Sequence, residues 1–272
     1  IGHITTTKAD GQYNCTGTLI GKYHILTASH CVYSNGEFIK SAYFDPAVLG
    51  IEKIKKWRFY IEKVWVNKRY KEYDDLGLDT SSHDIAVLQI KKYEGQEVPG
   101  DRYGSLFPRE ISHIKNDLNL KLSGYSGDKA YATLWESECL VGEFDPSDGS
   151  HKYECDSYSG ASGGPITVYD EQRKTSRMIG VHVGAIGSPA FKNEFVSFNS
   201  EIIEDIKRIT DADNENVEFF EQRSLEMDPK ISVIFHNKCH VTLYFGLRYK
   251  NLDSEWVTEG YYTLEPGEAY KL

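Results

Sequence analysis

The 272-residue sequence is poor in proline and cysteine and has no long apolar run, and each shortage excludes a class of structure. Its 8 prolines leave little material for rigid linkers. No segment approaches the roughly 18 consecutive apolar residues of a membrane span. The 5 cysteines show no CxxC spacing, which gives no support to a zinc cluster. We therefore expect neither a metal site nor a membrane-spanning segment.

Positive charge is also scarce. The 31 Lys and Arg residues are outnumbered by 41 Asp and Glu residues, for a formal net charge of −10, and no basic block stands out. A surface that binds nucleic acid needs clustered basic residues. Nucleic acid is therefore disfavoured as a partner.

Helical periodicity is rare, whereas aromatic residues are plentiful, with 19 Tyr, 12 Phe and 4 Trp. Short β-rich runs separated by Gly, Pro, Asn and Asp predict an all-β fold, either a barrel or a sandwich. One stretch, SEIIEDIKRIT at residues 200–210, places isoleucines at helical spacing behind a candidate cap at Ser200. We expect this helix to close the main domain.

The chain divides into three parts by composition. Residues 1–210 form the expected main domain, and residues 211–228 form an acidic connector. Residues 229–272 resume strand character and predict a small β-module near the lower size limit for independent folding. This module contains the aromatic residues Trp256, Tyr261 and Tyr262. Such residues usually form the core of a small β-domain, and the alternative is a face that binds an unknown partner.

Three short motifs carry the candidate chemistry. His30 lies in LTASHCV after a predicted strand, Asp84 begins the apolar run DIAVLQI, and Ser162 lies in the glycine-rich SGASGGP. Hydrolysis by a serine needs a hydroxyl, a base, a carboxylate that orients the base and backbone donors for the oxyanion. Each motif alone has a plain structural interpretation. The order His, Asp, Ser along a β-rich chain matches chymotrypsin-like proteases, not subtilisins or α/β-hydrolases.

These motifs resemble those of the trypsin-like serine proteases. The run GYSGDKAYATLWES, followed by GASGGP and GVHVGA, is similar to the glutamyl endopeptidases of staphylococci and bacilli, and the resemblance covers about residues 1–210. It implies a chymotrypsin-like double β-barrel, with His30 as general base, Asp84 as its orienting partner and Ser162 as nucleophile. It also implies that the N–H groups of Gly160 and Ser162 bind the oxyanion.

The same resemblance implies a pocket for an acidic side chain. His182 in GVHVGA matches the residue that contacts the acidic substrate side chain in glutamyl endopeptidases, and Ser157 matches a hydroxyl residue of the same pocket. Imidazole and hydroxyl groups can bind a carboxylate removed from water. The alternative is that His182 is a core histidine bonded to the backbone.

Two features depart from the family pattern. Ala161 replaces the Asp that pairs with the freed N-terminal amine in trypsin-like zymogens, so that activation switch cannot operate. In glutamyl endopeptidases the mature amine helps to form the acidic pocket, but IGHITTT resembles the first barrel strand instead. We expect that a segment precedes Ile1 in the full protein.

The five cysteines suit two disulfides and one leftover thiol, as in an oxidising compartment. The resemblance implies the bridge Cys15–Cys31 beside His30, and Cys139 pairs with Cys155 ahead of SGASGGP. Cys239 remains, as a buried, reactive or intermolecular thiol, and a buried thiol is favoured.

The hypothesis that follows is a secreted or periplasmic serine endopeptidase that uses no metal or organic cofactor and cleaves proteins or peptides after Glu or Asp. One alternative is a trypsin-like protease of other specificity. Another is a protease-like binding protein in which catalysis is vestigial.

Overall fold

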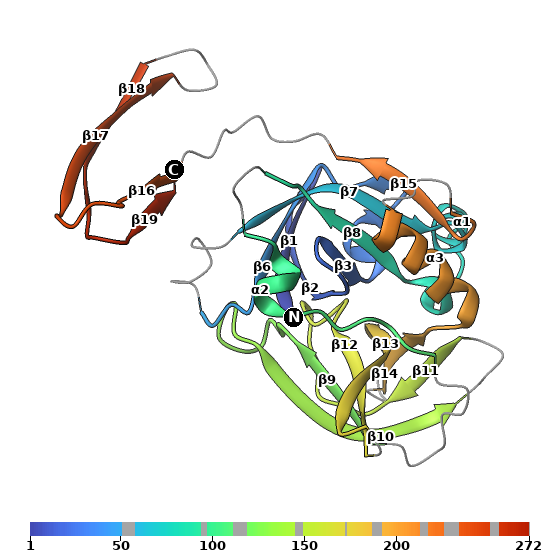
Figure 1. The fold of residues 1–272 in the computed structure, drawn as a ribbon. Helices are drawn as coiled ribbons and strands as arrows, with labels where there is room; N and C mark the ends of the chain where they lie inside the picture. The colour runs from blue at the N-terminus through green and yellow to red at the C-terminus, as the bar shows by residue number, and fades with distance from the viewer. Residues whose placement is uncertain are drawn as a thin grey trace. The chain divides into compact units, whose positions relative to one another are not determined.

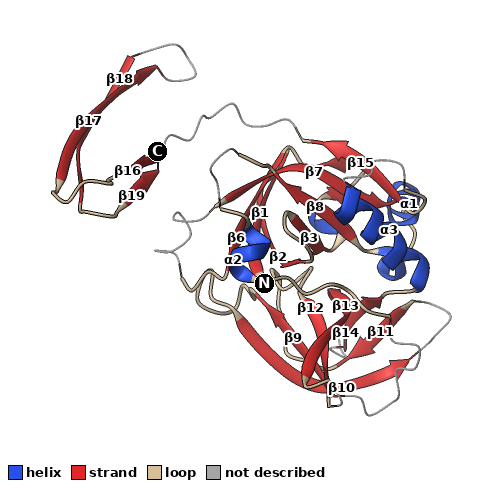
Figure 2. Ribbon diagram, in the orientation of Figure 1, coloured by secondary structure: helices blue, strands red, loops and turns tan. Residues whose placement is uncertain are grey.

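The computed structural model describes residues 1–50, 58–93, 97–110, 119–144, 149–171, 173–186, 192–212, 217–225, 234–250 and 256–271. Strands dominate these residues (Figure 2), which confirms the predicted all-β class. The described residues fall into two compact units: one contains those up to Leu225, and the other contains those from Ile234 onward.

The N-terminal half of the first unit is a closed six-stranded barrel (Figure 1). Its strands follow the order β7-β6-β1-β2-β3-β8, and a further pairing of β7 with β8 closes it. Along β7, Phe59 and Ile61 are buried while Tyr60 and Glu62 are half-buried, which is the period-two pattern of a strand with one face in a core. The strands are β1 (Gly2–Lys8), β2 (Gly11–Leu19), β3 (His24–Thr27), β6 (Ser41–Pro46), β7 (Phe59–Asn67) and β8 (Ala86–Ile90).

A second closed barrel follows, with the strand order β10-β11-β14-β13-β12-β9. Leu122, Ile166 and Phe195 are among the buried side chains that fill it. Its strands are β9 (Asn119–Gly124), β10 (Trp135–Phe144), β11 (Ser150–Tyr153), β12 (Pro165–Asp170), β13 (Thr175–Ile186) and β14 (Lys192–Ser197). The double β-barrel predicted from the resemblance is therefore confirmed.

Thr16 of β2 joins the two barrels. Its N–H donates to the carbonyl of Ser162 at 2.7 Å, and its hydroxyl donates to the carbonyl of Gly160 at 2.9 Å. The same hydroxyl accepts a hydrogen bond from the N–H of Tyr125 at 2.9 Å. The loop between β11 and β12 is thus fixed directly to the first barrel.

Short helices and a two-stranded hairpin connect and cover the strands. They are η1 (Ser29–Cys31), β4 (Tyr33–Ser34), β5 (Glu37–Phe38), α1 (Lys68–Leu76), η3 (Ser81–His83), α2 (Pro99–Tyr103) and α3 (Ser200–Ala212). The predicted helix is α3, and Ile202, Ile206 and Ile209 are buried along it. Its cap differs from the prediction, because the side chain of Asn199, not that of Ser200, accepts the N–H of Ile202 at 2.8 Å.

The segment 211–228, expected to be an acidic connector, belongs in part to the first barrel. Its strand β15 (Phe220–Ser224) pairs antiparallel with β7. Val217, Phe220 and Leu225 are buried in the same core as the barrel strands. The acidic composition hid these apolar residues, which are spaced too far apart to form a recognisable run.

The C-terminal unit consists of two antiparallel pairs, β16 (Ile234–His236) with β19 (Ala269–Lys271) and β17 (Leu243–Lys250) with β18 (Trp256–Leu264). The ring of Phe245 packs 4.7 Å from Phe235 and 5.5 Å from Tyr262, centroid to centroid. Tyr262 therefore contributes to packing, while the side chains of Trp256 and Tyr261 lie outside the described part.

Cys239 is exposed, which corrects the expected buried thiol. The residue follows strand β16 in a turn, where Asn237 and not the cysteine supplies the buried contacts. The Asn237 side chain donates to the carbonyl oxygens of Val241 and Leu264, at 2.8 Å each.

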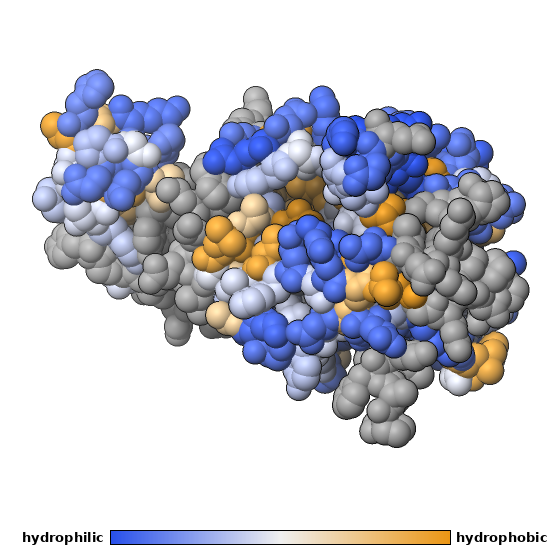
Figure 3. Space-filling view, turned by 90° about the horizontal axis from the view of Figure 1, so that it is seen from below, coloured by the Kyte–Doolittle hydropathy of each residue, from blue (hydrophilic) through white to orange (hydrophobic). Residues whose placement is uncertain are grey.

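On the face shown in Figure 3, hydrophobic residues form separate groups between hydrophilic ones. Among the described helices, none is long and apolar enough to cross a membrane.

Candidate active site

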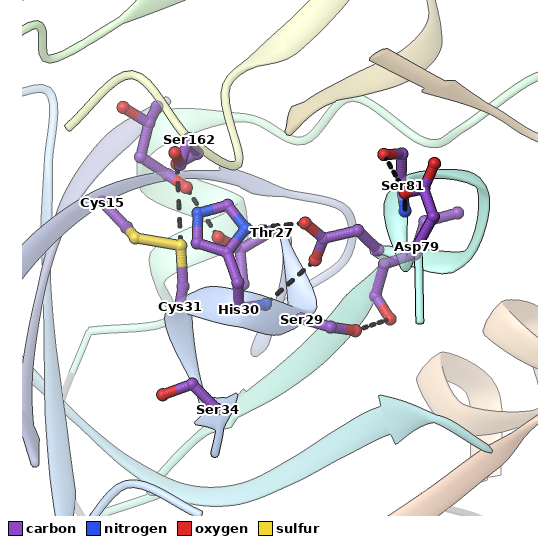
Figure 4. A network of polar contacts seen from close by, with 12 residues as sticks. Cys15, Thr27, Ser29, His30, Cys31, Ser34, Asp79, Ser81 and Ser162 are labelled. Atoms are coloured by element: carbon purple, nitrogen blue, oxygen red, sulfur yellow. Dashed lines mark hydrogen bonds and ion pairs between the residues drawn. A yellow bond between two sulfur atoms is a disulfide. The ribbon is translucent and has the colours of Figure 1, made fainter. Parts of the chain in front are cut away.

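His30 lies on the one-turn helix η1, directly after strand β3. The hydroxyl of the preceding Ser29 donates to the carbonyl of Ile85 at 2.7 Å, and the following Cys31 is bonded to Cys15 (Figure 4). The N–H of His30 itself donates to Asp84 Oδ1 at 2.9 Å. These bonds connect η1 to the residues around the start of β8.

Asp84 also binds the imidazole. His30 Nδ1 lies 2.6 Å from Asp84 Oδ2. The Asp84 side chain is only 7% exposed, whereas that of His30 is 33% exposed. A carboxylate at Nδ1 holds a proton on that nitrogen and leaves Nε2 as the acceptor of the neutral ring. This is the arrangement that a general base needs.

The same contact controls the protonation of His30. Burial lowers the pKa of the imidazole, but the charge and the hydrogen bond of Asp84 outweigh burial, so the pKa is raised above its ordinary 6.5. A raised pKa makes His30 a stronger base.

The loop around Ser162 has a conformation that only glycine permits at two positions. Gly160 has φ +100°, and a Cβ there would lie 2.5 Å from the carbonyl oxygen of Tyr125. Gly163 has φ +84°, and a Cβ there would lie 2.1 Å from the hydroxyl oxygen of Thr27. Gly160 is therefore required by close packing against the residue that follows β9 in the second barrel, and Gly163 by close packing against β3 of the first barrel.

The N–H groups of this loop divide into two sets. Those of Ala161, Gly163 and Gly164 donate to the carbonyls of Tyr158, His182 and Ala161, respectively. None of the described residues accepts a hydrogen bond from the N–H of Gly160 or of Ser162. Two such donors, one on the serine itself and one two residues before it, can bind an anionic oxygen.

Ser162 and His30 come together across the junction of the barrels. The carbonyl of Ser162 lies 3.9 Å from Cys31 Sγ, and Figure 4 shows Ser162 beside the His30 ring, near the disulfide. Asp84, at 2.6 Å from Nδ1, lies on the other side of the ring. The structure thus brings all three predicted residues into one place.

His182, on β13, is buried at 2% exposure. Its Nδ1 lies 2.7 Å from the hydroxyl oxygen of Tyr153. Burial and the charge of His30 lower its pKa to about 4, against a hydrogen bond to the backbone of Glu194. The backbone contact agrees in part with the alternative of a core histidine.

Ser157 is half-buried, and its hydroxyl donates to Asn193 Oδ1 at 2.7 Å. The amide of Asn193 donates in turn to the carbonyl of Cys155. Ser157 and His182 are thus anchored on the successive β14 residues Asn193 and Glu194. Sequence reasoning missed Tyr153 and Asn193, because neither lies near its partner in the chain.

Both predicted disulfides are present, Cys15–Cys31 and Cys139–Cys155. Val141 pairs with Tyr153 across β10 and β11, and the second bridge joins Cys139, two residues before Val141 in β10, to Cys155, two residues after the end of β11. The sulfur atoms of Cys15 and Cys31 lie near His30, but they are bonded to each other. This group therefore lacks the thiolates that would bind a metal.

Comparisons with known proteins agree with this geometry. The family model described as Trypsin matches residues 2–104. The glutamyl endopeptidase of Bacillus licheniformis is 23% identical over 205 residues, and that of Staphylococcus aureus strain MW2 is 24% identical over 225 residues. The alignments cover 71% and 79% of this chain.

The chain is therefore similar to the trypsin-like serine proteases, and the curated relatives that it matches are glutamyl endopeptidases. The chain spans 58% of the length of the Bacillus relative and 62% of that of the Staphylococcus relative.

Solved structures share the trypsin-like fold. A Glu endopeptidase in complex with MPD superimposes with a TM-score of 0.62 at 23% identity, covering 77% of this chain and 90% of that one. The protease Anisep from Arthrobacter nicotinovorans has a TM-score of 0.62 at 18% identity, covering 77% of this chain and 94% of that one.

Proposed function

We propose that this trypsin-like chain is an endopeptidase that hydrolyses peptide bonds through an acyl-enzyme on Ser162. The observation that carries the proposal is the His30–Asp84 contact of 2.6 Å, on a loop that lies beside Ser162. His30 Nε2 takes the proton of the Ser162 hydroxyl as the oxygen attacks the substrate carbonyl. The imidazole then gives that proton to the leaving amine, and water repeats the sequence to release the acid.

The N–H groups of Gly160 and Ser162 stabilise the oxyanion of the tetrahedral intermediates. Their lack of partners among the described residues supports this role, because donors that are already free need not break a bond when charge develops. Asp84 stabilises the imidazolium that forms in each step.

The test of the nucleophile is Ser162→Ala. We expect the variant to unfold at the same temperature as the wild type and to lose at least about 10³-fold in kcat. A fluorophosphonate probe should label the wild type at Ser162 and leave the variant unlabelled. Cleavage of peptides by the variant at the wild-type rate would refute the assignment, and an unlabelled wild type would favour a vestigial, protease-like binding protein.

We further propose that the substrate residue before the cleaved bond is Glu or Asp, recognised by His182 and Ser157. Support comes from the similarity to glutamyl endopeptidases and from the anchoring of both side chains on neighbouring residues of β14. His182 has a pKa of about 4 and is neutral at pH 7 in the free protein. A bound carboxylate would raise that pKa and favour the charged ring.

Peptide libraries test this preference, with cleavage sites identified by mass spectrometry. We expect cleavage after Glu and Asp, and Ser157→Ala should lower kcat/KM for a Glu substrate by about tenfold or more, through loss of a bond to a charged group. Ser176→Ala is the matched control, because Ser176 is exposed on β13. Equal cleavage after Lys, Phe and Glu would refute the acidic preference but not the hydrolase.

The two disulfides also support the proposal of a secreted or periplasmic protein, since such bridges persist mainly in oxidising compartments.

A further inference from the structure

Lys8, the last residue of β1, reaches the loop that carries the general base. Its Nζ donates to the backbone carbonyl of His30 at 3.1 Å and to the hydroxyl of Ser34 at 2.8 Å. His30 is the second residue of the three-residue helix η1, so the helix ends too soon to supply a donor for its carbonyl. Lys8 supplies that missing donor from 22 residues earlier in the chain.

The surroundings of Lys8 hold its ammonium group in this position. The side chain is half-buried, and Nζ lies 5.1 Å from the centroid of the Tyr13 ring. The hydroxyl of Tyr13 donates to Asp10 Oδ2 at 2.8 Å. Burial lowers the pKa of Lys8, against the charges of Asp10 and Asp74.

His30 is therefore bonded to a charged group on each side of its backbone. Asp84 accepts its N–H, and Lys8 donates to its carbonyl. His182 on β13 also interacts with the His30 charge, and its pKa of about 4 makes it neutral at pH 7. Asp84 raises the pKa of His30, and Lys8 opposes this rise.

We propose that Lys8 is a positioning residue for the general base: it holds the loop of His30 in place and extends activity to lower pH. The inference rests on the proposed function, since it assigns a role within the same site. A cation near His30 disfavours the imidazolium, so a larger fraction of the enzyme carries a free base at a given acidic pH. For a partly exposed pair of charges the effect is about half a pH unit.

Three variants of the full chain test the proposal at low ionic strength. Lys8→Met removes the charge and both hydrogen bonds, Lys8→Gln removes the charge but keeps a donor, and Lys8→Arg keeps the charge. The acid limb of kcat/KM against pH reports the base of the free enzyme. We expect the acid limb to move to higher pH by about half a unit in the Met and Gln variants, and to lie at the same pH as in the wild type in the Arg variant.

The outcomes separate this role from a purely structural one. A structural lysine would change kcat or the unfolding temperature without moving the acid limb, so an unmoved limb in the Met and Gln variants would overturn the proposal. The Gln variant keeps the test valid if the Met variant fails to fold.

A second measurement separates the proposal from the function on which it rests. The pKa of His30 can be followed by NMR of the imidazole in the wild type and in Lys8→Gln, without any substrate. A rise in the variant supports the role of Lys8 even if no peptide is cleaved, and no rise refutes it. Absence of peptide cleavage and of fluorophosphonate labelling in the wild type would instead refute the proposed function.

Discussion

At the scale of single residues, the site depends on contacts between parts of the chain that are far apart in sequence. His30 and Asp84 are separated by 54 positions, and Thr16 and Gly160 by 144. Each of the three motifs alone has a plain structural interpretation, and they were recognisable together because of their order His, Asp, Ser along the chain. The helpers Lys8, Tyr153 and Asn193 were not, because nothing in their local sequence marks them.

Asp84→Asn tests the orientation of the base. An amide at this position can present its NH₂ group to Nδ1, which favours the wrong tautomer of His30. We expect kcat at pH 7 to fall by about 10⁴-fold with little change in KM for the same peptide. Asp79→Asn serves as the control, because among the described residues the Asp79 carboxylate accepts hydrogen bonds from the N–H and the hydroxyl of Ser81, within its own turn. A loss of less than tenfold in Asp84→Asn would contradict the assigned role.

At the scale of elements, sequence patterns predicted a β-rich chain and one helix, and the cap of that helix differed from the prediction. Helix α1 was missed because its apolar positions are few. It is delimited instead by its ends, since the side chain of Asn67 accepts the N–H groups of Arg69 and Tyr70, and Gly77 ends it at φ 68°. Strand β15 was missed because an edge strand with one buried residue, Phe220, has no clear alternation.

Asn199→Ala tests the cap of α3. The substitution removes the acceptor for the N–H of Ile202, so we expect the free energy of unfolding to fall by about 1 kcal/mol. Ser200→Ala is the control, and it should change the stability by less than half as much. Urea titrations of the three proteins measure both values, and a larger effect at Ser200 would show that the cap is assigned to the wrong residue.

At the scale of the whole molecule, burial makes stability depend on pH. His3 packs edge-on against Tyr125 and Tyr131, and burial with the nearby charge of Arg58 lowers its pKa to about 4. Burial, and then the charge of His30, lowers the pKa of His182 to about 4. Below pH 6.5 the unfolded chain binds protons that these folded sites refuse, so stability falls as the pH falls towards 4. His30, with its raised pKa, acts in the opposite direction.

We expect each of the two buried histidines to cost about 2 kcal/mol of stability between pH 7.5 and pH 5. His3→Phe should remove the loss of stability that His3 causes, because a phenyl ring keeps the aromatic contacts and does not titrate. Urea unfolding of wild type and variant at both pH values measures the difference. An identical pH dependence in the two proteins would contradict the low pKa of His3.

The amino-acid sequence alone was enough to predict the β-rich class and the three catalytic motifs, because these depend on local composition, on periodicity and on short motifs. The bridge Cys15–Cys31 was implied by the resemblance to trypsin-like proteases, and it is present in the structure. Only the tertiary structure decided that β15 joins the first barrel, that Cys239 is exposed and that Lys8 caps the loop of His30. Those features depend on which distant segments pack together, and a local sequence pattern does not encode that packing.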